Sequence, residues 1–303
     1  MRASVVIPTC SRLDGLQRVL AGLEQQWRPG GTELEIVVVD DGSVDGTWDW
    51  LSARSAASKW KVVRQANRGP AVARNRGVES ASGELVLFLG DDTVPQPGWL
   101  AAHLEEHRLF GQAGPLAVLG YTSFPASVDG PFSRFINEYG AQFGYSIIDN
   151  VASLPFNFFY TSNISLPRAE LLRHGGFRED FPAAAWEDIE FAYRAQRAGL
   201  AIRYQPRART IHEHCVRPRT FCRRQRTSGL SAAIFYDLHP ELASLLGVGR
   251  VRRRAIPARL QAVLLWLLIE LGERIEGVVP APVYQEYLDL CYERGLAAGL
   301  QKH

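Results

Sequence analysis

The stretch Phe88-Leu89-Gly90-Asp91-Asp92-Thr93-Val94-Pro95 decides the fold of this chain. It closes an apolar run that begins at residue 85, and two adjacent carboxylates follow the run directly. Such a run predicts a buried strand with a pair of acids at its carboxyl end, which is where open α/β sheets bind their ligands. A turn in which Asp91 and Asp92 only cap a helix would produce the same local pattern. The stretch by itself does not separate these two interpretations.

The adjacent acids have an electrostatic consequence if they meet at a ligand site. Two ionised carboxylates so close repel each other, which raises the pKa of one of them unless a cation neutralises the pair. Mg²⁺ and Mn²⁺ prefer oxygen ligands and often hold a phosphate group at the same time. The functional interpretation of Asp91 and Asp92 is therefore a divalent cation site that also binds phosphate.

Strand and helix patterns alternate on both sides of this stretch. Apolar or β-branched runs predict strands, and patterns of helical period predict helices between them. The predicted strands cover residues 4–7, 36–39, 61–63, 85–89, 116–120, 158–166 and 201–204, and the predicted helices cover 13–26, 47–57, 71–80 and 187–197. Strands that are apolar throughout are typical of a mostly parallel sheet flanked by helices. The sequence thus predicts an α/β fold, with a loop over the site at residues 124–150.

Composition divides the chain near residue 215. The whole chain of 303 residues has a net charge of +2, whereas residues 216–303 carry 13 Lys and Arg against 8 Asp and Glu. We therefore expect two parts, 1–215 with the sheet and 216–303 as a helical C-terminal extension. A basic extension suits an anionic partner, either a membrane surface or a phosphate-bearing substrate, and no nucleic-acid partner is expected.

Cysteine usage and hydropathy bear on location. The cysteines stand at irregular spacing, at Cys10, Cys215, Cys222 and Cys291. With no signal peptide before them, they predict reduced thiols and a cytoplasmic location. The longest strongly apolar run, residues 262–269, is too short to span a bilayer. We therefore expect that no segment crosses a membrane. The alternative to a purely cytoplasmic location is peripheral contact with the inner face of the cell membrane.

Polar side chains follow three of the predicted strands at the point where each strand ends. Thr9 to Arg12 follow the first strand, Asp40 and Asp41 the second, and Asp91 and Asp92 the fourth. The carboxyl ends of parallel strands lie along one edge of a sheet, so these groups are expected to converge on one crevice. No G-x-G-x-x-G follows the first strand and no P-loop motif is present, which disfavours dinucleotide and P-loop sites.

Two further segments have both an ordinary and a functional interpretation. Arg74 lies in the basic run 68–77, and the ordinary interpretation of this run is a solvated helix start. The functional interpretation is that Arg74 holds a diphosphate or braces the carboxylates. Glu187 and Asp188 open a helix, where the helix dipole stabilises acids without any function. A carboxylate in that place, under a loop of aromatic residues, also suits a general base.

The segment His212-Glu213-His214-Cys215, with Cys222 beyond it, raises the question of zinc. Its spacing fits none of the common structural zinc patterns. A single histidine that completes an oxygen-rich metal site is the favoured interpretation, and an ordinary surface histidine is the alternative.

Six motifs follow one another along residues 3–214. They are Val6-Ile7-Pro8-Thr9, Val39-Asp40-Asp41-Gly42-Ser43, Ala73-Arg74-Asn75-Arg76-Gly77, Gly83-Glu84 leading into Leu89-Gly90-Asp91-Asp92, Gly175-Gly176-Phe177 and Glu187-Asp188. In this order they resemble the family 2 inverting glycosyltransferases. The resemblance implies a Rossmann-like GT-A catalytic domain over residues 1–215, a nucleotide-diphosphate sugar donor of the UDP or dTDP type, and Mn²⁺ or Mg²⁺ as cofactor.

The resemblance also implies roles for individual residues. Asp188 takes the place of the catalytic base, while Asp92 and His212 take the place of metal ligands. The donor-binding positions are Pro8, Thr9, Arg12, Asp41 (nucleobase), Arg74 and Asp91 (ribose). The positions on the acceptor or sugar side are Asn163, Trp186 and Glu187.

The implied function is a single displacement that inverts the sugar's anomeric carbon, with a hydroxyl acceptor in cell-surface polysaccharide or glycolipid synthesis. Gly90 departs from the family, since many members have a third acid there. The mechanism uses the last two acids, so we expect activity to survive. The alternatives are nucleotidyl transfer or sugar-nucleotide hydrolysis, and a non-catalytic scaffold that binds nucleotide sugars.

The C-terminal region contains two arginine runs and an apolar stretch. One run lies in residues 217–226 and the other in residues 250–254, just before the apolar residues 260–271. A solvated basic helix that packs its apolar face on the catalytic domain would explain this pattern. The alternative is a region that rests on an anionic membrane and meets a lipid-linked acceptor.

Overall fold

The computed structural model describes most of the chain and divides it into two compact units. It describes residues 2–26, 31–55, 60–125, 131–138, 142–214, 216–253, 258–275 and 279–301, without the side chains of residues 137–138, 252–253, 258–260 and 273. Unit 1 comprises Met1–Pro125, Ile147–Glu179 and Glu187–His214. Unit 2 comprises Ala126–Ser146, Asp180–Trp186 and Cys215–His303. The expected C-terminal part thus shares its unit with two earlier segments.

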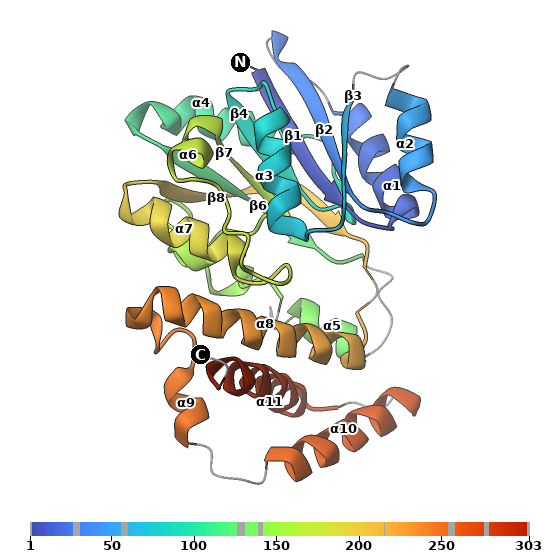
Figure 1. Ribbon diagram of the computed structural model, residues 1–303, viewed down its shortest axis with the longest axis vertical. Helices are drawn as coiled ribbons and strands as arrows, with labels where there is room; N and C mark the ends of the chain where they lie inside the picture. The colour runs from blue at the N-terminus through green and yellow to red at the C-terminus, as the bar shows by residue number, and fades with distance from the viewer. Residues whose placement is uncertain are drawn as a thin grey trace. The chain divides into compact units, whose positions relative to one another are not determined.

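Unit 1 is built on an eight-stranded sheet in the order β3-β2-β1-β4-β7-β6-β8-β5 (Figure 1). The strands are β1 (Arg2–Thr9), β2 (Glu33–Asp41), β3 (Trp60–Gln65), β4 (Leu85–Leu89), β5 (Thr93–Pro95), β6 (Leu116–Ser123), β7 (Asn163–Pro167) and β8 (Ala201–His212). The pairs β1–β2, β1–β4, β2–β3 and β6–β8 are parallel, and β7 and β5 pair antiparallel with their neighbours. The expected α/β fold with a mostly parallel sheet is confirmed.

Helices flank this sheet. They are α1 (Leu13–Glu24), α2 (Thr47–Ser55), α3 (Pro70–Ser80), α4 (Trp99–Phe110), α6 (Arg168–Arg173) and α7 (Glu187–Arg197). The central strands are apolar along their length because both faces are covered: Val5 and Ile7 of β1 are fully buried together with Leu16 of α1. Gly77 lets α3 approach β1 closely, since a Cβ there would collide with Val6. The tight packing of α3 on β1 explains the glycine of that motif.

Several predicted boundaries differ from the structure. The strand expected at 158–166 begins only at Asn163, because Phe156–Phe158 forms a 3₁₀ turn. The strand expected at 201–204 continues to His212, because β6 and the short β5 pair with it along its length. Within 124–150, where a loop was expected, the described residues include the helix α5 (Pro131–Glu138). The end of the helix predicted at 47–57 lies outside the described residues.

Unit 2 is helical. Besides α5 it contains α8 (Pro218–Leu238), α9 (Val248–Arg253), α10 (Ala258–Arg274) and α11 (Ala281–Leu300). The helices α8 and α11 pack very closely, because a Cβ on Gly229 or Gly295 would collide with backbone of the other helix. Within the part of the chain that is described, no helix combines the length and apolar composition needed to cross a bilayer.

The expectation of reduced thiols is wrong for two of the cysteines. Cys222 of α8 and Cys291 of α11 form a disulfide, with their Cα atoms 5.6 Å apart. They are separated by 69 residues in the sequence, so only the pairing of the two helices brings their side chains within bonding distance. Cys10 is a free thiol, and Cys215 lies outside the described residues.

Candidate active site

The acid pair after β4 meets residues at the carboxyl end of β1. The hydroxyl of Thr9 donates to Oδ2 of Asp91 at 2.9 Å. The guanidinium of Arg12 pairs with Asp92 and lies 3.7 Å from Oδ1 of Asp91. Because β1 and β4 are parallel neighbours, their carboxyl ends lie side by side. The expected convergence of these two strand ends is therefore present.

The two acids titrate differently. Burial, followed by the neighbouring charge of Asp92, raises the pKa of Asp91 to about 6 despite opposing contributions from Arg12 and Thr9. Burial also acts to raise the pKa of Asp92, but the charges of His212, Arg12 and His214 outweigh it and lower the pKa. The repulsion between the adjacent carboxylates thus contributes to the raised pKa of Asp91. Asp92, whose pKa is lowered, is the better anionic ligand for a cation.

His212 reaches the acid pair through the short strand β5. The pairing of β5 with β8 places His212 opposite Thr93, the residue after Asp92. Its Nε2 atom lies 3.5 Å from Oδ1 of Asp92, and the ring is buried against the edge of Phe124. His212 therefore lies beside Asp92, and its role as a metal ligand stays a prediction.

Asp92 and His212 form a donor set suited to a divalent cation. A carboxylate oxygen and an imidazole nitrogen are ligands that Mn²⁺ accepts, and Mg²⁺ takes the carboxylate readily. No group of three or more His, Cys, Asp and Glu side chains with metal-binding geometry occurs among the described residues. Asp92 and His212 would supply two ligands of such a cation, and its other ligands would have to come from bound molecules such as a diphosphate or water.

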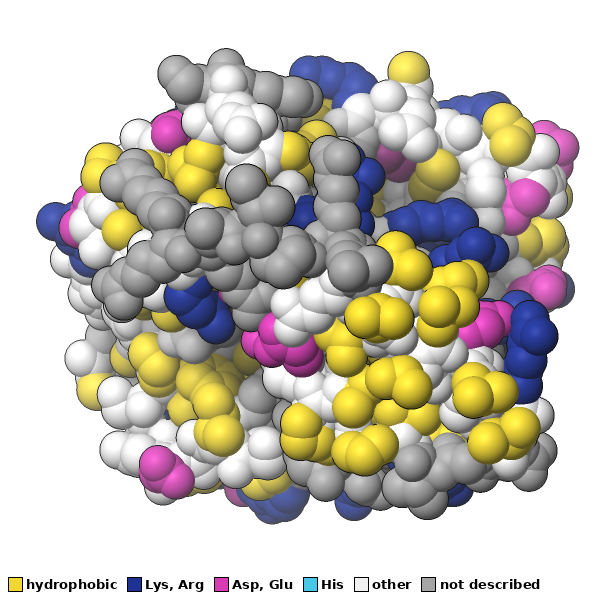
Figure 2. All heavy atoms as spheres, turned by 90° about the horizontal axis from the view of Figure 1, so that it is seen from below, with side chains coloured by type: hydrophobic (Ala, Val, Ile, Leu, Met, Phe, Trp, Pro, Cys, Tyr) yellow, Lys and Arg dark blue, Asp and Glu magenta, His cyan; other side chains and the backbone are white. Residues whose placement is uncertain are grey.

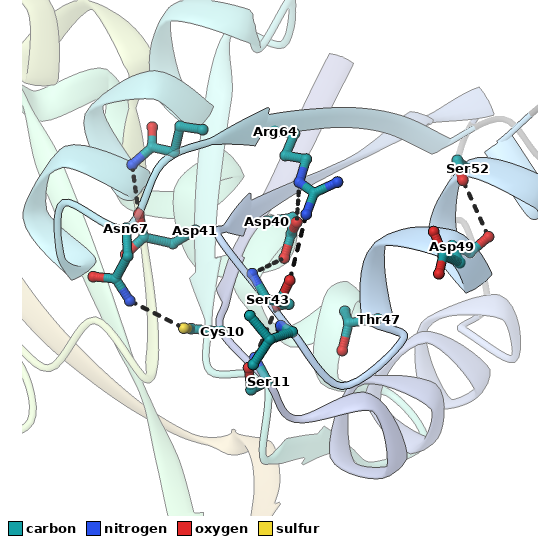
Figure 3. Close-up of polar contacts among 12 residues, drawn as sticks. Cys10, Ser11, Asp40, Asp41, Ser43, Thr47, Asp49, Ser52, Arg64 and Asn67 are labelled. Atoms are coloured by element: carbon teal, nitrogen blue, oxygen red, sulfur yellow. Dashed lines mark hydrogen bonds and ion pairs between the residues drawn. The ribbon is translucent and has the colours of Figure 1, made fainter.

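Asp40 and Asp41 at the end of β2 have separate partners (Figure 3). The carboxylate of Asp40 lies 3.3 Å from Arg64 and accepts the backbone N–H of Ser43 at 3.1 Å. Asp41 accepts the backbone N–H groups of Arg68 and Gly69, each at 2.9 Å, as well as a side-chain N–H of Gln65 at 2.8 Å. Asp41 thereby holds the turn that leads into α3.

Arg74, one turn into α3, is not a solvated residue. Its guanidinium pairs with Glu187 at 2.6 Å and lies over the ring of Phe177, and both charged side chains are buried. Burial and the charge of Asp188 raise the pKa of Glu187 to about 7, although Arg74 opposes the shift. The ordinary alternative of a solvated helix start therefore does not apply to Arg74, which braces Glu187. Its role in binding a diphosphate stays a prediction.

Asp188 is held by the segment before β7. Its Oδ2 accepts the backbone N–H and the hydroxyl of Thr161, at 3.2 and 3.1 Å, and its Oδ1 accepts the N–H of Ile189 at 2.9 Å. The carbonyl of Ser162 accepts the N–H of Gly90 at 3.4 Å, directly before the acid pair. Two adjacent residues of one segment thus join Asp188 to the end of β4.

The comparison with known families agrees with these motifs. Residues 4–145 match the family described as Glycosyl transferase family 2, and this match includes the ends of β1, β2 and β4. The first part of the chain is therefore similar to glycosyl transferase family 2. Asp188 and His212 lie beyond the matched residues, so their places rest on the geometry above and on the motif order.

Two transferases are among the curated proteins to which the chain is similar. Validoxylamine A glucosyltransferase of Streptomyces hygroscopicus subsp. jinggangensis is 32% identical over 223 residues, covering 66% of this chain and 52% of that protein. Pre-mycofactocin glycosyltransferase of Mycobacterium tuberculosis is 26% identical over 275 residues, covering 89% of this chain and 53% of that protein. The chain spans about half the length of the curated relatives it matches.

Solved structures of glycosyltransferases share the fold. The mannosyltransferase PcManGT from Pyrobaculum calidifontis, in complex with GDP-Man and Mn²⁺, has a TM-score of 0.63 at 20% identity and covers 99% of this chain and 86% of its own. S. aureus TarS 1-349 has a TM-score of 0.56 at 20% identity and covers 100% of this chain and 92% of its own. The expected GT-A fold is confirmed.

The family 2 resemblance placed Asn163 and Trp186 on the acceptor or sugar side. Asn163 is fully buried, and its amide binds Trp99, His103 and the carbonyl of Ala208 inside the core. The structure therefore does not bring Asn163 to a ligand, because its polar atoms serve the interior. Trp186 belongs to unit 2, where its indole N–H donates to the carbonyl of Ser228 at 3.1 Å. Its acceptor role stays a prediction, as does the donor role of the partly buried Pro8.

One residue of this site, Thr161, was not predicted from the sequence, although the polar run Thr161-Ser162-Asn163 before an apolar strand is a visible pattern. The absence of an acid at Gly90 also has a steric counterpart. A Cβ at Gly90 would lie 2.7 Å from the hydroxyl oxygen of Thr93 and 3.1 Å from Oδ1 of Asp92. Glycine therefore leaves room for the carboxylate of Asp92.

The Gly-Gly-Phe and Ala-Arg-Asn motifs of family 2 interlock in this chain. The side-chain amide of Asn75 donates to the carbonyl of Phe177 at 2.8 Å and accepts its N–H at 2.9 Å. Gly176 has a φ of +66°, and a Cβ there would lie 2.5 Å from Oδ1 of Asn75. The two motifs thus position α3 and the ring of Phe177, which lies under Arg74.

Proposed function

We propose that the chain is a metal-dependent inverting glycosyltransferase that moves a sugar from a UDP- or dTDP-type donor to a hydroxyl acceptor. The observation that carries the proposal is the junction between two sets of acids. Thr161 holds Asp188 while the next residue, Ser162, binds the backbone just before Asp91 and Asp92. This junction places a candidate base close to the two carboxylates that follow β4. Such an arrangement suits a reaction in which an acceptor attacks a donor bound by its diphosphate.

Asp188 acts as the general base in this proposal. It accepts the proton of the acceptor hydroxyl, and the oxygen attacks the anomeric carbon from the face opposite the nucleotide. The bond from the anomeric carbon to the diphosphate oxygen breaks in the same step, so the configuration inverts. The hydrogen bonds from Thr161 and Ile189 hold the carboxylate in one orientation for this transfer.

The donor lies along the ends of β1, β2 and β4. Asp41 binds the nucleobase, Asp91 binds the ribose, and Thr9 and Arg12 orient the acids. Asp92 and His212 would hold the cation. When bound, the cation supplies Lewis-acid stabilisation of the negative charge that develops on the leaving diphosphate.

The comparisons support the class of this reaction. The curated relatives are named as glycosyltransferases, and the PcManGT structure holds a nucleotide sugar with Mn²⁺. Since the chain spans about half of those relatives, its own donor sugar and acceptor are part of the proposal. A role in cell-surface polysaccharide or glycolipid synthesis, a cytoplasmic location and peripheral contact with the membrane belong to the same proposal.

A binding and product assay tests the function. Nucleotide sugars are screened by thermal shift with and without Mn²⁺, since a ligand that binds only the folded state raises its melting temperature. Each stabilising donor is then incubated with a panel of hydroxyl acceptors, and the product is identified by mass spectrometry and its anomeric configuration by NMR. A glycosylated product of inverted configuration is expected. Pyrophosphate or free sugar alone would indicate nucleotidyl transfer or hydrolysis, and binding without turnover would indicate a scaffold.

A further inference from the structure

The helix α10 of unit 2 exposes a continuous apolar face. Each of its large apolar side chains on this face is half exposed or more, namely Val263 (51%), Leu264 (54%), Leu267 (50%), Leu268 (56%) and Leu271 (56%), with Ile275 (68%) just beyond the helix. These positions recur every three or four residues, so they lie along one side of the helix. Figure 2 shows hydrophobic side chains gathered over part of this face of the molecule, with Lys and Arg beside them.

The opposite side of α10 is buried within unit 2. Ala262 and Ile269 are buried, and the helix packs mainly against α11 and also against α5. A helix that is apolar on both sides is typical of a buried element or of one in contact with lipid. Within unit 2, the described apolar side chains on the other face of α10 are left uncovered. Contiguous exposed apolar side chains mark an interaction surface.

Cationic side chains accompany the apolar face. The guanidinium of Arg219 lies over the ring of Trp266 at 5.8 Å, and the side chain of Arg274 is 74% exposed. Arg250 is also exposed, and the sequence places four arginines within residues 250–254, just before α10. Residues 250–275 hold six arginines and only two glutamates. Apolar side chains with cations around them are typical of helices that lie in the interface of an anionic bilayer.

We propose that the exposed face of α10 docks on the surface of an anionic lipid bilayer. The leucines enter the boundary between headgroups and acyl chains, and the arginines remain at the level of the lipid phosphates. A second copy of the chain fits this face less well, because it would add the same positive charge to the interface. The docking deepens the peripheral membrane contact that the proposed function includes. Because it depends on neither the donor nor the acceptor, a failure of docking and a failure of the transferase activity are distinguishable.

Flotation of the full-length chain with vesicles tests the docking. Vesicles of phosphatidylcholine mixed with phosphatidylglycerol are compared with pure phosphatidylcholine, at low and at high salt. The double variant Leu264→Asp/Leu268→Asp removes two leucines from the exposed face. Its matched control is Leu172→Asp on α6, since Leu172 is equally exposed (51%) but lies in unit 1.

The wild type and Leu172→Asp are expected to float with the anionic vesicles at low salt and to be released by high salt. The double variant is expected to lose more than about tenfold in partitioning, because its two leucines no longer enter the lipid. An unchanged melting temperature and circular dichroism spectrum would show that the variant is folded. Failure of the wild type to float, or equal partitioning of wild type and double variant, would overturn the proposal. Sedimentation showing a wild-type dimer that the double variant abolishes, without vesicle binding, would assign the face to a second copy instead.

Discussion

Thr161 donates both its backbone N–H and its hydroxyl to one oxygen of Asp188, at 3.2 and 3.1 Å. Thr161 is buried, whereas Asp188 is partly exposed, so the carboxylate is fixed from the protein side and open on another. A carboxylate at a helix start ordinarily only stabilises the helix. The hydrogen bonds from Thr161 fix the orientation of this one, which makes Asp188 a candidate for proton transfer.

Replacement of Thr161 should affect catalysis through Asp188. Thr161→Val removes the hydroxyl donor but keeps the backbone N–H and the shape of the side chain. We expect kcat to fall by about tenfold, the scale of one lost hydrogen bond of 1.5 kcal/mol or slightly less, with KM for the donor unchanged. Steady-state kinetics measure this, and Thr161→Ser should restore kcat because it restores the hydroxyl. Equal loss in the serine variant would assign Thr161 to packing alone.

Asp188→Asn should nearly abolish transfer and leave donor binding almost intact. The amide keeps the size of the side chain but cannot accept a proton, and general-base catalysis is worth ~10²–10⁴-fold. The loss should therefore appear in kcat, while calorimetric titration of the nucleotide sugar gives a wild-type affinity. A variant that keeps more than half of the wild-type activity would refute the role of Asp188.

The two acids after β4 should separate in a binding experiment. We expect Asp92→Ala to remove the Mn²⁺ dependence of nucleoside diphosphate binding, since Asp92 faces His212. Asp91→Ala should weaken binding with or without Mn²⁺, since Asp91 is bound by Thr9 and is assigned to the ribose. Calorimetric titrations with and without the metal measure both effects. Identical behaviour of the two variants would contradict this division of roles.

The stability of unit 1 should fall in mild acid because of two buried histidines. Burial lowers the pKa of His103 to about 4, and burial together with His103 lowers that of His107 to about 3. Both rings bind Ser165 on β7, at 2.9 and 2.8 Å. Unfolded histidine titrates near ~6.5, so below that pH the unfolded chain binds protons that the folded chain does not. The stability is fully present above about pH 6.5 and is lost progressively as the pH falls toward the folded values.

Urea unfolding from neutral pH down to about pH 4 measures this linkage, and the two histidines together should account for on the order of a few kcal/mol. His107→Gln should flatten the slope of unfolding free energy against pH, because glutamine does not titrate. His239→Gln in unit 2 is the comparison variant for the same exchange of side chains outside unit 1. A slope unchanged in His107→Gln would show that this histidine is not the source.

The disulfide should stabilise unit 2. Cys222→Ser opens a covalent link between residues 69 apart, and closing a loop of that size is typically worth about 2–4 kcal/mol. Thermal unfolding is expected to show a lower melting temperature for Cys222→Ser, and treatment with a reductant should lower the wild type to a similar value. Cys10→Ser is the control, since Cys10 is a free thiol. A melting temperature that neither Cys222→Ser nor the reductant lowers would contradict the prediction.

Local patterns in the sequence determined the α/β class, the strands β1, β2 and β4, and the polar residues at their ends. The apolar runs are continuous because both faces of the sheet are covered, and this property is visible in a short window. The three-residue strand β5 was not visible, since so short a segment becomes a strand only by pairing with β8. The position of His212 beside Asp92 depends on that pairing.

The tertiary structure alone decided which distant side chains meet. Thr161 and Asp188 are 27 residues apart, Arg74 and Glu187 are 113 apart, and the bonded cysteines are 69 apart. It also decided that the side chain of Asn163 makes its hydrogen bonds inside the core and that α10 leaves its leucines exposed. The sequence established the chemical types and their order, because these are properties of neighbouring residues. Partners and exposure depend on which elements pack together, and that is settled only when the whole chain folds.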